Sequence, residues 1–205
     1  MTITELTQLT GGLSSPSKMP CHSFSLPASK CLRGSELAKI EGTVCSKCYA
    51  MKGRYRFPNV QEAQQRRFQI LMADRAYEYK TWKQRMSGLI MLKEKSGYFR
   101  WHDSGDIQDL NHLRAINWIA KTLPYIKFWL PTREYLILKD FFEGEDVADN
   151  LNIRLSTDTL HKDIRVEKEI PSWLDVTFST VGANEGWRCP APSYQGKCNK
   201  CRACW

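Results

Sequence analysis

The eight cysteines constrain this chain most, because they lie in two groups near its ends and none occurs between Cys48 and Cys189. A disulfide scaffold with this many cysteines is usually much shorter than 205 residues, and here it would leave the whole middle of the chain without a cross-link. The opening residues, MTITELTQLTGGLSS, lack the basic start and apolar core of a signal peptide, and no apolar run approaches membrane-spanning length. We therefore expect a cytoplasmic protein with no membrane segment, whose cysteines are metal ligands and not disulfide partners.

The C-terminal group consists of Cys189, which precedes Pro190, and the run Cys198-x2-Cys201-x2-Cys204. Three thiolates at two-residue spacing are typical of the [4Fe–4S] ligands of bacterial ferredoxins. Zinc is the alternative, but zinc sites usually pair two separated Cys-x2-Cys elements, so the run favours an iron–sulfur cluster. In two-cluster ferredoxins the cysteine before proline ligates the other cluster. The sequence therefore leaves open which cluster Cys189 ligates.

The N-terminal group contains one strong local spacing, Cys45-x2-Cys48, and two more distant members, Cys21 and Cys31. It is compatible with a second cluster or with zinc, and the alternative is a set of buried, reduced thiols. Basic residues lie among both groups, as suits an anionic cluster: Lys30, Arg33, Lys47, Lys52, Lys197, Lys200 and Arg202. We expect one or two [4Fe–4S] clusters, and the pairing of cysteines between sites stays open.

The chain divides into three zones of a single domain. Residues 1–58 have the composition of loops with short elements, residues 59–180 alternate helical and strand-like patterns, and residues 181–205 return to loops that carry cysteines. Helices are predicted from an N-cap at Asn59, over about Ala76–Lys95, over Leu110–Leu123 and over Glu134–Ala148. Strands are predicted over Tyr98–His102, Ile126–Leu130, Asn152–Ser156 and Asp175–Ser179. This alternation predicts an α/β fold of parallel units, a partial (β/α) barrel with cysteine-rich N- and C-terminal loop segments.

Each predicted strand has one apolar face and one polar, largely basic face. Barrel interiors are ordinarily filled with branched apolar side chains, so a polar interior predicts a cavity for an anionic ligand. We expect Arg100, Lys127, Arg154 and Ser156 to bind that ligand. The net charge of +8 permits a small anion or nucleic acid as partner. The alternatives are an open sheet in another register and scattered basic residues that are merely solvated.

Polar residues also follow each predicted strand, at the end where parallel α/β folds bind their ligands. Our candidates for a catalytic site are His102, Asp103, Asp106, Arg133 and Glu134. His102 and Asp103 suit acid–base chemistry, and Arg133 suits the binding of an anion. The alternative is a structural role in helix capping and ion pairing, because Asp106, Thr132 and Asp158 are good N-cap residues.

Several segments resemble the phage-encoded gene product 88 family: MPCHSFSLPASKC, GTVCSKCYAMKGRYRFPNV, WHDSGDIQ, FWLPTRE, CPAP and CNKCRACW. They span nearly the whole chain, from Met19 to Trp205, and the resemblance implies a phage protein in the cytoplasm of a bacterial host. The Cys-x2-Cys-Tyr-Ala segment and the βα layout are also similar to a truncated radical S-adenosylmethionine protein. The chain lacks the Cys-x3-Cys-x2-Cys motif and the Gly-Gly-Glu segment of those enzymes.

Three functions follow from these patterns. The first is a [4Fe–4S] protein with a redox or reductive role, an anionic ligand in a basic cavity and an electron-transfer partner. The second is a nucleic-acid-binding module stabilised by zinc or by clusters, and the third is an atypical radical S-adenosylmethionine enzyme. The patterns do not decide whether the protein is an enzyme.

Overall fold

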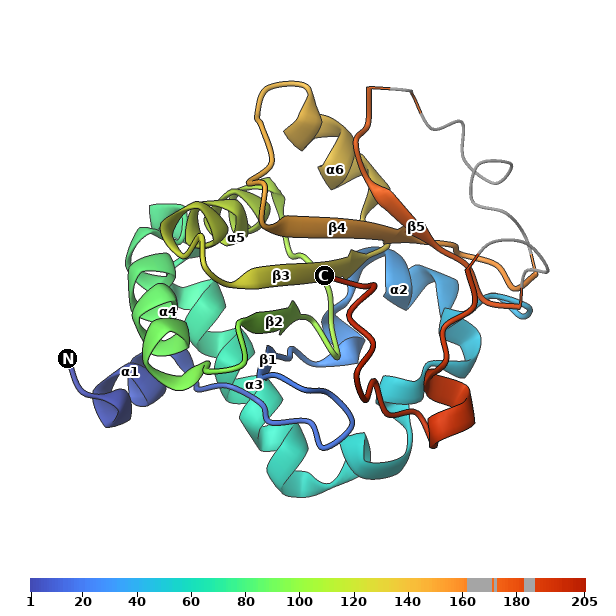
Figure 1. The fold of residues 1–205 in the computed structure, drawn as a ribbon, viewed down its shortest axis with the longest axis horizontal. Helices are drawn as coiled ribbons and strands as arrows, with labels where there is room; N and C mark the ends of the chain where they lie inside the picture. Colours follow the sequence, from blue (N-terminus) through green and yellow to red (C-terminus); the bar gives the residue numbers. More distant parts are fainter. Residues whose placement is uncertain (162–170, 172, 183–186) are drawn as a thin grey trace.

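The computed structural model describes residues 1–161, 171, 173–182 and 187–205. Within these ranges the chain has an α/β fold around a parallel sheet of five strands in sequence order (Figure 1). The strands are β1 (Ser23–Phe24), β2 (Tyr98–Trp101), β3 (Lys127–Thr132), β4 (Leu151–Ser156) and β5 (Thr177–Ser179). The predicted α/β class is therefore confirmed, and the sheet described here is open, with β1 and β5 at its edges.

The α-helices are α1 (Ile3–Thr10), α2 (Leu32–Leu37), α3 (Pro58–Ala73), α4 (Lys80–Lys93), α5 (Leu110–Thr122) and α6 (Tyr135–Phe142). Short 3-10 turns are η1 (Ala28–Lys30), η2 (Cys45–Lys47), η3 (Tyr49–Met51), η4 (Gly53–Arg56), η5 (Arg75–Tyr77) and η6 (Ala191–Tyr194). The helix α5 matches its prediction because its apolar stripe is regular and Asp109 caps it, accepting the His112 N–H at 2.8 Å. Among the described helices none is long and apolar enough to cross a bilayer.

The apolar face of the sheet forms the core with α3, α4, α5 and α6 (Figure 1). Phe99 and Trp101 of β2 alternate in burial with their neighbours, as do Phe128 and Leu130 of β3. Helix α4 contributes Trp82, which meets Phe24 and Trp101 edge-on or tilted at ring distances of 5.5 and 6.2 Å. The predicted division into an apolar and a polar face is confirmed for β2, β3 and β4, whose burial alternates along the strand.

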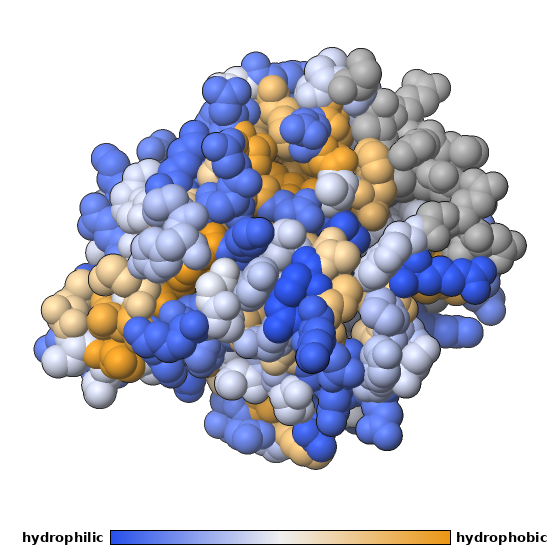
Figure 2. Space-filling view, in the orientation of Figure 1, coloured by the Kyte–Doolittle hydropathy of each residue, from blue (hydrophilic) through white to orange (hydrophobic). Residues whose placement is uncertain are grey.

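The C-terminal segment runs back across the polar face of the sheet (Figure 1). The indole N–H of Trp205 donates to the carbonyl of Phe99 at 2.9 Å, and the Asn152 amide donates to the carbonyl of Cys204 at 2.9 Å. Figure 2 shows many hydrophilic residues on this side of the molecule. The last residues of the chain thus lie against β2 and β4 on this face.

The structure differs from the predicted elements in four places. Strand β1 was not predicted, and α3 begins at Pro58 with Phe57 as N-cap, so the N-cap prediction at Asn59 is wrong. The second helix begins late, at Lys80, because Glu78 and Tyr79 adopt left-handed φ angles of 52° and 56° that interrupt a helix. The fourth predicted helix, over Glu134–Ala148, corresponds to α6 and ends early, at Phe142.

Candidate metal centres

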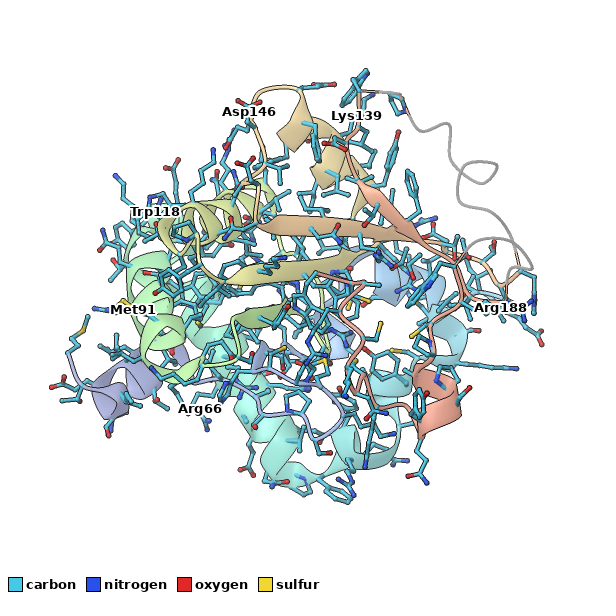
Figure 3. All side chains as sticks on the ribbon, in the orientation of Figure 1. Arg66, Met91, Trp118, Lys139, Asp146 and Arg188 are labelled. Atoms are coloured by element: carbon cyan, nitrogen blue, oxygen red, sulfur yellow. The ribbon has the colours of Figure 1, made fainter. Side chains whose placement is uncertain are left out.

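All eight cysteines lie in the described ranges, and none of them forms a disulfide. Figure 3 shows sulfur atoms gathered beside the C-terminal segment, toward the carboxyl ends of the strands. Through their charges the thiols influence one another's pKa in two groups, one of five cysteines and one of three.

The C-terminal site consists of Cys189, Cys198, Cys201, Cys204 and, from the other end of the chain, Cys21. The backbone N–H of Cys198 donates to the carbonyl of Lys18 at 3.0 Å, which ties the C-terminal loop to the segment that leads into β1. Burial raises the pKa of Cys21 to about 12, and the neighbouring Cys198 adds to the shift. Burial also raises the pKa of Cys198 and of Cys204, and Cys189 adds to both shifts.

Three arginines accompany this site and favour the thiolate forms. Arg100 and Arg202 act on Cys21 and Cys198, whereas Arg154 and Arg100 act on Cys204. Arg100 lies with its guanidinium 4.2 Å over the ring of Trp129, and Arg154 donates to the carbonyl of Ala203 at 3.1 Å. Two of the residues predicted to bind an anion, Arg100 and Arg154, therefore lie beside the C-terminal cysteines.

The N-terminal site consists of Cys31, Cys45 and Cys48, from the start of α2 and from η2 with its C-cap. Gly34 separates two of them: a Cβ at Gly34 would lie 3.5 Å from Sγ of Cys31 and 3.7 Å from Sγ of Cys45. The pKa of Cys31 is raised by burial and then by the charges of Asp106, Cys48 and Cys45. The raised pKa values keep Cys31 and Cys45 protonated in the metal-free protein, so binding of a metal would have to displace these protons.

The ends of the strands hold the N-terminal site in place. Arg33 of α2 pairs with Asp158, which follows β4, through Nε at 3.1 Å and Nη2 at 3.0 Å. The N–H of Val44, next to Cys45, donates to the carbonyl of Asp158 at 2.9 Å. Asp158 therefore anchors both cysteine-bearing turns to the sheet and does not cap a helix among the described residues.

Three of the predicted catalytic residues lie beside the N-terminal thiols: Asp106, Arg133 and Glu134. Asp106 is buried and accepts the Thr132 hydroxyl at 2.7 Å and the N–H of Arg133 at 3.0 Å, while burial raises its pKa. Burial, followed by the charge of Asp106, raises the pKa of Glu134 to about 7. Glu134 accepts the N–H of Arg33 at 3.0 Å, so α2 reaches this carboxylate as well.

Asp103 joins the two sites. It accepts the hydroxyl of Ser23 at 2.7 Å and that of Tyr55 at 3.0 Å, and its carbonyl accepts the Tyr49 hydroxyl at 2.6 Å. Tyr49 follows Cys48, and its hydroxyl also accepts a hydrogen bond from Arg100 at 3.3 Å. A continuous set of contacts thus runs from the N-terminal thiols to the arginine beside the C-terminal thiols.

Three other predicted site residues have partners other than the cysteines. His102 has a left-handed φ of 52° and packs against Trp101 and against His112 of α5, and burial holds its pKa well below the usual range. Lys127 lines a hollow of about 520 Å³ at the start of β3, together with Trp205. Ser156 ends β4 and pairs in register with Ser179.

Sequence reasoning missed Gly34, Tyr55 and the place of Cys21. No local spacing relates Cys21 to the C-terminal run, because the two meet only through the tertiary fold. Within the ranges described, no three His, Cys, Asp or Glu side chains converge on a point that would hold a single metal ion. A cube-shaped cluster binds each thiolate at a separate iron and needs no such point.

A known family model matches nearly the whole chain. The family model described as Gene product 88 matches residues 2–205, in agreement with the resemblance of the cysteine-bearing segments. No curated protein and no solved structure matches the chain. The chain therefore belongs to the Gene product 88 family.

Proposed function

We propose that this protein binds two [4Fe–4S] clusters, one at each cysteine site, and serves in electron transfer or in a reductive reaction. The observation that carries the proposal is the C-terminal site, where a ferredoxin-like run of cysteines meets Cys21 beneath Arg100, Arg154 and Arg202. The scaffold is best regarded as a partial (β/α) barrel in the cytoplasm of the phage's bacterial host. The C-terminal site then lies on its inner, polar face.

The residues present fit such clusters in donor chemistry and in charge. Thiolates are the ordinary ligands of iron–sulfur clusters, and a [4Fe–4S] cluster with four thiolates is anionic, which suits the three arginines. Gly34 leaves open the space between Cys31 and Cys45 that a side chain would fill. When bound, the clusters would supply one-electron chemistry, and the protein would supply thiolates, cations and burial.

The contacts between the two sites support transfer of electrons between them. Tyr49 extends from the N-terminal site and accepts a hydrogen bond from Arg100, which is half-buried and influences Cys21, Cys198 and Cys204 by its charge. A charge change at one site would be felt at Arg100 and hence at the other site. We expect the reduction potentials of the two clusters to depend on each other.

Anaerobic purification with quantification of iron, acid-labile sulfide and zinc tests the proposal. We expect a brown protein with about eight irons and about eight sulfides per chain. A colourless protein that carries zinc contradicts it and favours the nucleic-acid-binding module, which salt-dependent binding of DNA or RNA would then support. A protein that binds no metal under reconstitution contradicts both.

A further inference from the structure

A hollow of about 790 Å³ lies between helix α3 and the turns η1, η3 and η4. These segments meet at the lower side of the molecule in Figure 1. The volume is that of an ordinary small-ligand site. The wall that α3 forms is polar and consists of four glutamines and two charged residues: Gln61, Gln64, Gln65, Gln69, Glu62 and Arg66. Neither cysteine site uses this hollow.

Gln64 leaves a hydrogen bond unmade at this wall. It is the buried one of the four glutamines, with 4% of its surface exposed, and its Nε2 has no hydrogen-bond partner among the described residues. Buried amides nearly always have partners, so this one indicates an additional molecule in the hollow. A side-chain amide carries both a donor and an acceptor, which is the combination that pairs with the edge of a nucleobase.

The chain around the hollow is strongly basic. Between Ser46 and Phe68 it carries a single acidic residue, Glu62, and five exposed basic residues: Lys47, Lys52, Arg54, Arg56 and Arg66. None of these five forms an ion pair with another residue that the structure describes. Their charge is therefore available to a polyanion, whose binding would release counterions.

Exposed apolar side chains alternate with these charges along the turns. The side chain of Tyr49 is on a residue 58% exposed, and Met51 and Phe57 are each 54% exposed. The Tyr49 hydroxyl donates to the carbonyl of Asp103 at 2.6 Å, which holds its ring in one orientation. Exposed aromatic rings among basic residues are typical of surfaces on which unpaired bases stack.

We propose that α3 and the turns η3 and η4 bind single-stranded nucleic acid. Its phosphates contact the exposed arginines, its bases stack on Tyr49 and Phe57, and the glutamines of the hollow bind the edge of one base. This inference goes beyond the proposed function and does not depend on which metal the cysteines hold. A duplex fits less well, because its bases are stacked on each other and cannot stack on the rings. An acidic protein would match the charges but would leave the amide of Gln64 without a partner.

The test is fluorescence anisotropy with the full-length, anaerobically purified protein and labelled oligonucleotides of about 12 nucleotides, a length within the site sizes of single-strand binders. Single-stranded DNA and RNA of mixed sequence are the probes. Binding of either supports the inference, and the tighter of the two identifies the ligand. The logarithm of the binding constant should fall against that of the salt concentration with a slope of about −3, as expected for about four phosphate contacts. A duplex that binds as tightly as the single strand overturns the inference.

Variants separate stacking from charge. Phe57→Leu keeps an apolar side chain but removes the ring, and it should weaken binding at least about fivefold without changing the salt slope. Arg66→Gln should weaken binding of all sequences and make the slope shallower by about 0.7. Lys139→Gln removes one exposed charge from α6, far from Arg66 in Figure 3, and should leave binding unchanged. If Arg66→Gln weakens binding and Phe57→Leu does not, the surface recognises charge alone and the inference is wrong.

A measurement on the wild type does not depend on how the variants fold. Ultraviolet cross-linking to an oligonucleotide that carries iodouracil, followed by peptide mapping, should place the cross-link within residues 49–69. Cross-links confined to other parts of the chain overturn the inference. Iron content of the same sample separates it from the proposed function: a chain with about eight irons that binds no oligonucleotide overturns the inference alone, and a chain that binds the oligonucleotide but no iron overturns the proposed function alone.

Discussion

The glycine between two thiols of the N-terminal site offers a sharp test of cluster binding. A methyl group at Gly34 would lie 2.9 Å from Cβ of Cys31 and within 3.7 Å of Sγ of both Cys31 and Cys45. It would occupy space that a cluster at these thiols needs. We therefore expect Gly34→Ala to abolish the N-terminal cluster and to spare the C-terminal one.

The cost to the metal-free fold should be small. Gly34 lies inside α2, where replacing glycine by alanine gains about 0.5–1 kcal/mol. The contact with Cys31 is shorter than the roughly 3.5–4.0 Å of an optimal carbon pair, and such overpacking costs about 1–3 kcal/mol. The gain offsets the cost only in part, so the free energy of unfolding of the metal-free protein should fall by about 1 kcal/mol.

The assay is iron content after anaerobic reconstitution, combined with urea unfolding of the metal-free protein. We expect the Gly34→Ala variant to bind about four irons where the wild type binds about eight. Gly88→Ala is the matched control, because it lies inside α4 and its new methyl would be 3.5 Å from Leu6, an ordinary contact. Full iron content in Gly34→Ala, or equal loss in both variants, would refute the reasoning.

Two further predictions concern the C-terminal site and the segment that carries Cys21. We take Cys189, the exposed thiol of the five, to be the one that the C-terminal cluster does not use. Cys204→Ser should then reduce iron to about four per chain, whereas Cys189→Ser should keep about eight; equal loss in the two variants would contradict this assignment. Glu94 accepts the N–H groups of His22 and Ser96, both at 2.7 Å, and although burial opposes ionisation these bonds lower its pKa below the ordinary 4.5. Its charge therefore stabilises the fold above the unfolded pKa, and this contribution is lost as the pH falls through the lower folded pKa. In urea unfolding, the free energy of unfolding of Glu94→Gln should be about 1.5–3 kcal/mol lower than that of the wild type at neutral pH. This difference should disappear in acid, and a difference that does not depend on pH would contradict the reasoning.

Local periodicity explains which elements were predictable. The strand over Leu151–Ser156 and the helix over Leu110–Thr122 alternate or repeat their apolar residues regularly, and both agree with the prediction to within one residue at each end. Strand β1 has two residues, Ser23 and Phe24, and no period can be read from two positions. It is a strand only because it pairs with Arg100 and Trp101 of β2.

The same pairing explains why the division of the cysteines was beyond sequence reasoning. Cys21 precedes β1, and the register of β1 with β2 places it near Arg100 and the C-terminal loop. The run of Cys198, Cys201 and Cys204 was recognisable because its spacing is local. The fifth member of that site depends on a strand that the sequence does not signal, and the three-cysteine site becomes evident only once Cys21 is assigned elsewhere.

Quantitative EPR of the reduced, reconstituted wild-type protein tests the central claim most directly. Two [4Fe–4S] clusters predict about two electron spins per chain, in two distinguishable signals that broaden each other through their proximity. A single signal with about one spin per chain, or an EPR-silent protein loaded with zinc, would contradict the claim that both cysteine sites hold clusters.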